Sequence, residues 1–106
     1  MILYYLTGYT YHIKEEIKAL KPNRKDMKSW WKFNYDFKCW ELKIANNLTS
    51  KKYEKALKEF AELHKLKYER IDDNKLKRSM HDFKTADDFF NYFHKQNNKT
   101  YYNNKG

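Results

Sequence analysis

The sequence predicts an α+β fold, with a small and mostly antiparallel sheet covered on one face by two or three helices. Apolar and polar residues alternate between positions 31 and 39, which is the two-residue period of a strand. Apolar residues recur at three- and four-residue spacing in segments 13–20 and 50–65, which is the period of a helix. The chain of 106 residues is long enough for one domain. The expected order is strand, helix, one or two strands, helix, a weakly indicated strand and a helix.

The first strand and helix are predicted at the N-terminal end. Ile2 to Tyr11 is rich in aromatic and apolar residues, and Gly8 marks a bulge or the strand end. Isoleucine and leucine then repeat at helical spacing between positions 13 and 20. Pro22 is expected to end this short helix.

Segment 30–44 admits two interpretations. The alternation shifts by one residue near Cys39–Trp40, and a strand with a bulge, or a hairpin, explains that shift. A helix is the alternative, because several apolar residues of the segment also fit the three-to-four spacing. A helix would leave Trp31, Tyr35 and Leu42 on its opposite side, so the strand interpretation is favoured.

The clearest helix runs from Ser50 to about Lys65. Thr49 or Ser50 can cap it. Its apolar stripe consists of Tyr53, Leu57, Phe60 and His64, with Ala56 and Leu63 beside it.

The remaining elements follow this helix. Leu66 to Ile71 alternates weakly and is read as a strand. The run from Thr85 to Asp88 is typical of a helix N-terminus, and the helix is expected to reach about Lys95. Residues 97–106 lack apolar periodicity. The sequence therefore predicts one α+β domain over 1–96 and a mobile polar tail over 97–106.

The charge favours a polyanionic partner. The formal net charge is +9 and the isoelectric point is about 9.5. Such a field attracts nucleic acid, acidic proteins or an anionic membrane face. Another explanation stays open, because the codons of Lys, Asn, Tyr and Phe are AT-rich, and an AT-rich genome could enrich lysine without selection for binding.

The sequence gives no sign of export or membrane insertion. Cys39 is the single cysteine, so no disulfide can form within the chain. The apolar start lacks the basic segment and cleavage site of a signal peptide, and no apolar run approaches the length of a membrane span. We therefore expect a cytoplasmic protein that does not bind a membrane.

No specific signal for catalysis or for a cofactor is present. The histidines, His12, His64, His81 and His94, form no metal-binding pair at helical spacing, and a single cysteine cannot build a structural zinc site. The chain has two glycines, so a glycine-rich phosphate loop is excluded. Glu15 and Glu16 are read as a solvated face and Cys39 as a buried, inert thiol. The sequence therefore predicts a protein that is not an enzyme, with no cofactor and no metal.

A basic cluster around two tryptophans is the best binding signal. Its members are Lys21, Arg24, Lys25, Lys28, Trp30, Trp31 and Lys32. Cations that contact phosphates, next to rings that stack on bases, are what a single-strand binder needs. The alternative is that the tryptophans are core residues and the cations a solvated loop. Because alternation places Trp30 and Trp31 on opposite faces, at most one of them is expected in the core.

A second basic patch is given less weight. It consists of Lys75, Lys77, Arg78 and Lys84. Phe83 is the one aromatic residue among them. The predominance of lysine over arginine in the chain favours phosphate contact without base recognition, because bidentate base contacts favour arginine.

The stretch from Tyr9 to Trp31 resembles a small accessory domain of unsettled function, often appended to replication, helicase and antirestriction proteins of phages and plasmids. The matching residues are Lys14, Glu15, Ile17, Lys18, Leu20, Arg24, Lys28 and Trp30. The chain has Lys21-Pro22 where the family usually has a glycine, and Lys25 where it usually has a tryptophan. The resemblance implies a mobile-element setting close to nucleic-acid processing and no catalytic residue.

Two hypotheses for the function follow. The first is a small basic accessory protein, encoded by a phage or mobile element, that binds DNA or RNA with little sequence specificity. The second is a protein-interaction module that inhibits or regulates a host defence or nucleic-acid-processing complex. Its basic face would then dock on an acidic surface, with exposed aromatic residues as anchors.

Overall fold

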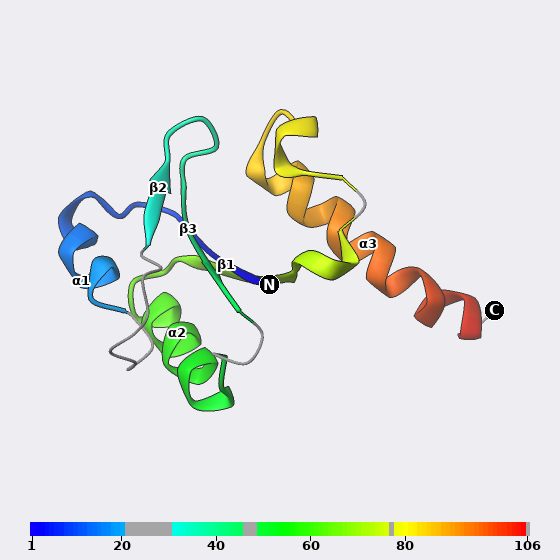
Figure 1. Cartoon of the computed structure of the whole chain (residues 1–106), viewed down its shortest axis with the longest axis horizontal. Coiled ribbons are helices and arrows are strands. Elements are labelled where there is room, and N and C mark those ends of the chain that lie inside the picture. The colour runs from blue at the N-terminus through cyan, green and yellow to red at the C-terminus, as the bar shows by residue number, and fades with distance from the viewer. Residues whose placement is uncertain (21–30, 46–48, 77, 106) are drawn as a thin grey trace.

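A computed structural model describes residues 1–20, 31–45, 49–76 and 78–105, with side chains up to Gln96 (Figure 1). The strands and helices follow in the order β1 (Ile2–Thr7), α1 (Lys14–Lys18), β2 (Lys32–Asn34), β3 (Cys39–Ile44), α2 (Lys51–Leu63), β4 (Lys67–Asp72) and α3 (Ala86–Lys105). Short 3-10 helices precede α1 (Tyr11–Ile13) and lie between β4 and α3 (Asp73–Lys75 and Met80–Asp82). The α+β class predicted from the sequence is confirmed.

The four strands form one antiparallel sheet in the order β2-β3-β1-β4. β1 is central, and Leu6 lies between Trp40 of β3 and Tyr68 of β4. The sheet thus places the N-terminal strand beside β4, although the two are far apart in the sequence. Gly8 ends β1 at φ +143°, where a Cβ atom would lie 2.8 Å from Leu66 Cδ2. A side chain at this position is therefore strained by the backbone and requires the Leu66 side chain to shift.

Strands β2 and β3 form a hairpin, which confirms the strand interpretation for the described residues of segment 30–44. Residues 35–38 make the turn, slightly earlier than the expected break near Cys39–Trp40. Asn34 holds this turn because its Oδ1 accepts hydrogen bonds from the backbone N–H groups of Asp36 (3.0 Å) and Phe37 (3.1 Å). Lys38 closes it in the left-handed region, at φ +53°.

The first core lies between the sheet and helices α1 and α2, as the predicted layout requires (Figure 1). Ser50 caps α2 as expected, because its hydroxyl accepts from the backbone N–H of Tyr53 at 3.0 Å. Ala56 and Leu63, expected beside the apolar stripe, are both exposed, and Leu63 is 76% exposed. The buried residues of this core are Ile2, Tyr4, Leu6, Ile13, Ile17, Trp31, Trp40, Leu42, Ile44, Leu57, Ala61 and Leu66.

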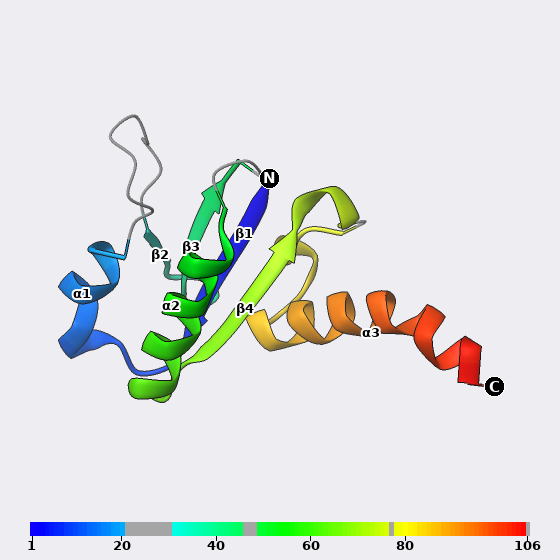
Figure 2. The ribbon, with the colours of Figure 1, turned by 90° about the horizontal axis from the view of Figure 1, so that it is seen from below.

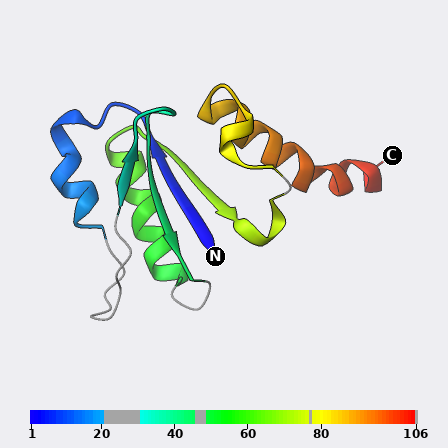
Figure 3. The same cartoon turned by 45° about the horizontal axis from the view of Figure 1, so that its top comes forward.

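A second core covers the other face of the sheet, so helices cover both faces and not one. Tyr5 lies next to Tyr4 on β1 but packs against Phe89 and Phe90 of α3. The views in Figures 2 and 3 place α3 apart from α1 and α2, with the sheet between them. The hydroxyl of Thr85 accepts from the backbone N–H of Asp88 at 3.1 Å, as expected for a cap. The helix then continues to Lys105, beyond the predicted end near Lys95.

Three polar side chains join β1, α2 and β4 at the edge of the first core. Glu54 Oε2 accepts hydrogen bonds from the hydroxyl of Tyr4 and from Arg70 Nε, both at 2.6 Å. Tyr4 is fully buried. Burial, and then its hydrogen bond to Glu54, raises the pKa of Tyr4, which keeps the hydroxyl protonated as a donor.

Candidate binding groove

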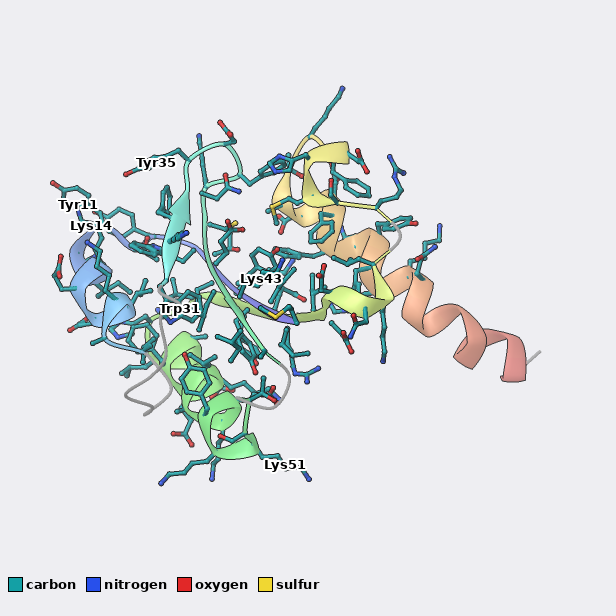
Figure 4. All side chains as sticks on the ribbon, viewed as in Figure 1. Tyr11, Lys14, Trp31, Tyr35, Lys43 and Lys51 are labelled. Carbon is teal, nitrogen blue, oxygen red and sulfur yellow. The ribbon has the colours of Figure 1, made fainter. Side chains whose placement is uncertain are left out.

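A groove of about 510 Å³ lies between the segment that contains α1 and the β2–β3 hairpin. Ligand sites commonly measure about 300–1,000 Å³, so it is large enough for a small organic group. Figure 4 shows Tyr11 and Lys14 on the α1 side and Tyr35 on the hairpin. The described residues that line the groove are Thr10, Tyr11, Lys14, Lys18, Trp31, Phe33, Tyr35 and Trp40.

The buried residues that line the groove are Trp31, Trp40 and Thr10. Each indole is 4% exposed and uses its N–H group inside the protein. Trp40 Nε1 donates to Thr10 Oγ1 at 2.9 Å, and Trp31 Nε1 donates to the backbone oxygen of Leu20 at 2.6 Å. Both indole donors are therefore committed, and the tryptophans offer a ligand carbon surface only.

The hairpin side of the groove is aromatic. Phe33 packs edge-on against Trp40 at 5.4 Å between ring centroids and against Tyr35 at 4.9 Å. Tyr35 follows directly after Asn34, whose side chain fixes the turn. Even so, Tyr35 is 82% exposed. The turn thus presents a large ring to solvent from a constrained backbone.

The α1 side of the groove is cationic. Lys14 and Lys18 are one helical turn apart, so both lie on the same face of α1. Lys14 Nζ lies 4.7 Å from the ring centroid of Tyr11, which is 73% exposed. Lys18 also pairs with Glu15 at 3.5 Å, but Glu15 is not among the residues that line the groove.

Most of the tryptophan-centred cluster predicted from the sequence lies outside the described residues. These members are Lys21, Arg24, Lys25, Lys28 and Trp30. Of the two described members, Trp31 lines the groove as a buried residue, and Lys32 is exposed on β2, cross-strand from Glu41. A hydrogen bond from Trp31 Nε1 to the backbone oxygen of Leu20 joins these two described residues.

The second basic patch lies on the side of the second core. Lys75, Arg78 and Lys84 are exposed, and Lys77 lies outside the described residues. The guanidinium carbon of Arg78 lies 4.7 Å from the ring centroid of Phe83. This arginine therefore packs the connection to α3, and the patch does not join the groove.

The residues considered for catalysis have structural surroundings. Cys39 is fully buried, and burial raises the pKa of its thiol to about 12, so the thiol stays protonated at neutral pH. Within the described part of the chain, no three His, Cys, Asp or Glu side chains are grouped so as to hold a metal ion. Each histidine contacts another side chain: His12 packs on Tyr9, His64 on Phe60 and His81 on Phe37, while His94 bonds Glu69 at 2.5 Å.

Sequence reasoning missed most of the groove. Tyr11 and Tyr35 are distant in the chain, and the fold brings both to the lining of one groove. The one sequence signal for the groove is the spacing of Lys14 and Lys18, which places both lysines on one side of a short helix. Because Glu15 and Glu16 lie between them, the sequence alone indicates a solvated charged face.

Comparisons with known proteins supply no relative. A scan against protein-family models, a search of curated proteins and a search of solved structures each found no match to this chain. The resemblance of 9–31 to a phage and plasmid accessory domain stays a prediction. No helix among the described residues combines the length and apolarity needed to cross a bilayer. The function must therefore be inferred from the groove itself.

Proposed function

We propose that this protein binds nucleic acid through the groove, by stacking and charge, with little sequence specificity. The observation that carries the proposal is the placement of two largely exposed tyrosines, Tyr11 and Tyr35, at an aromatic groove that Lys14 and Lys18 also line. Aromatic rings beside cations are the two components of single-strand binding surfaces.

The distribution of donors supports low specificity. Sequence is read by hydrogen bonds to base edges, most often from arginine, asparagine or glutamine. None of these residue types is found among the described residues that line the groove, and the indole N–H groups of Trp31 and Trp40 are already bonded within the protein. Apart from the hydroxyls of Tyr11 and Tyr35, the described lining offers ring faces and lysine charges, and both of these act on any base or phosphate alike.

Salt dependence tests the proposal. Each phosphate contact with a single strand contributes about −0.7 to the log–log salt slope of the binding constant. Changing Lys14 and Lys18 together to Gln is expected to make the slope shallower by roughly 1.4. Lys51→Gln with Lys52→Gln is the matched control, because these exposed residues carry the same charge on α2, and Figure 4 places Lys51 far from the labelled groove residues. Fluorescence anisotropy of a labelled oligonucleotide at several salt concentrations measures both slopes.

A third variant probes the cation directly. Glu15→Gln removes the carboxylate that pairs with Lys18 at 3.5 Å. An exposed pair of this kind is worth about 0.2–1 kcal/mol, so binding is expected to strengthen by up to about fivefold. If Glu15→Gln weakens binding instead, a phosphate contact at Lys18 is contradicted.

Two results would overturn the proposal. If the Lys51 and Lys52 variant weakens binding as much as the Lys14 and Lys18 variant, binding follows overall charge and the groove has no special role. If no oligonucleotide binds at physiological salt, the protein-interaction hypothesis takes first place. A pull-down whose captured protein survives nuclease treatment would then favour an inhibitor or regulator of a host complex.

A further inference from the structure

The residues that line the groove restrict the class of ligand that it can bind. We infer that the groove accepts a single unpaired nucleotide, whose base inserts among the aromatic rings while its flanking phosphates bind the lysines of α1. This inference rests on the proposed function and specifies how the site works.

Stacking needs a free base face. In a duplex both faces of each base are covered by neighbouring pairs, so rings reach a base only where the strand is single or the base is extruded. The aromatic side of the groove runs from Trp40 through Phe33 to Tyr35 in edge-to-face contacts of 5.4 and 4.9 Å. These contacts bring ring edges together and leave most of the Tyr35 side chain uncovered.

The stacking residue on the hairpin is held in place before a ligand arrives. Two backbone N–H groups of the turn donate to Asn34 Oδ1, and Phe33 packs against the Tyr35 ring. A side chain that is already positioned loses little conformational freedom on binding, which favours affinity. The exposed ring of Tyr35 can therefore stack on a ligand at a small entropic cost.

The cations line the groove on the side across from the hairpin, where they can contact the phosphates of an inserted nucleotide. Four residues of a helix rise about 6 Å, so Lys14 and Lys18 line the α1 side at two successive levels. A base between the rings of the hairpin and Tyr11 would place its own backbone along this row. A single strand offers both a free base face and phosphates, whereas a duplex offers the phosphates alone.

The decisive comparison uses four probes: a short oligo-dT strand, the same strand with abasic sites, a duplex of equal length and inorganic polyphosphate. Stacking of one base is worth about 1–3 kcal/mol, so the intact strand is expected to bind roughly 5- to 150-fold more tightly than the abasic strand. Tyr35→Ala should reduce this advantage severalfold and leave the affinity for the abasic strand and the salt slope unchanged. Tyr35→Phe, which keeps the ring, should restore it.

Tyr9→Ala is the matched control. Tyr9 is 72% exposed like Tyr35 but does not line the groove. Equal losses in the two alanine variants would show that the base is not held at the hairpin. If abasic strand, duplex and polyphosphate all bind as well as the intact strand, insertion is refuted while charge-driven nucleic-acid binding stands. If none of the probes binds, the proposed function fails as well.

Discussion

The carboxylate of Glu54 is expected to stabilise the fold far more than any exposed carboxylate of the same helix. It accepts from the buried hydroxyl of Tyr4 and from Arg70. Glu54→Ala leaves that hydroxyl buried without a partner, which costs about 1–3 kcal/mol. The half-exposed Arg70 returns to water and adds at most about 1 kcal/mol. A loss of about 2–3 kcal/mol is therefore expected, or roughly 10–20 °C in Tm for a domain of this size.

Glu59 supplies the control, and Tyr4 supplies the test of mechanism. Glu59 pairs with Lys55 at 4.0 Å in solvent, so Glu59→Ala is expected to cost less than about 0.5 kcal/mol. In a Tyr4→Phe background the buried donor is gone, so Glu54→Ala should cost about 1 kcal/mol less than in the natural chain. Urea unfolding followed by circular dichroism measures these differences. Equal losses for the Glu54 and Glu59 variants, or strict additivity with Tyr4→Phe, would refute the reasoning.

The same carboxylate predicts an acid-sensitive component of stability. Burial alone would raise the pKa of Glu54, but hydrogen bonds from Tyr4 and Arg70 outweigh it and lower the pKa below its ordinary value. A lowered folded-state pKa means that this stabilisation is present above the unfolded pKa of about 4.3 and is lost as pH falls through the folded value. The Tm difference between the natural chain and Glu54→Gln should therefore shrink in acid. A difference that is constant down to pH 2 would contradict this.

Three further predictions concern the backbone. Gly8→Ala forces a Cβ atom against Leu66 at φ +143°, so a loss of about 1–3 kcal/mol is expected in urea unfolding; an unchanged midpoint would mean that the strand end adjusts freely. Lys38→Gly relieves a left-handed residue and should raise stability by about 0.5 kcal/mol, whereas a lower Tm would show that the lysine side chain packs. Deletion of Asn98 to Gly106 removes a segment without a periodic apolar face and should leave Tm nearly unchanged; a loss of several degrees would show that its tyrosines pack on the domain.

Local signals predicted most of the elements. The alternation at 31–39 and the shift that follows it depend on neighbouring residues. They predicted extended structure with a bulge or a hairpin, and the structure shows the β2–β3 hairpin. The cap at Ser50 and the spacing after it predicted α2 in the same way. Each of these features is determined within a few residues of the chain, so a single sequence is enough to find it.

Features that depend on distant contacts were not predictable in this way. The continuous apolar run of β1 is the sign of a strand buried on both faces, yet the second core becomes evident only when Phe89 and Phe90 are placed against Tyr5. The length of α3 was underestimated because a formed helix extends at little cost even through residues without apolar periodicity. The groove joins α1 to a hairpin turn, and no local pattern relates Tyr11 to Tyr35.

The position of Cys39 gives this protein an internal reporter of partial opening. The thiol lies in the second core with Phe89 and Phe90, whereas α1 and α2 pack in the other core. Detachment of α3 would therefore uncover the sulfur while the α1–α2 side of the sheet stays packed. Under native conditions the rate of modification by a thiol reagent follows the smaller of two opening free energies, that of α3 or that of the whole domain. The opening free energy from this rate can be compared with the free energy of unfolding from urea. Equal values indicate that the domain unfolds as one cooperative unit, and a smaller opening free energy indicates that α3 detaches separately.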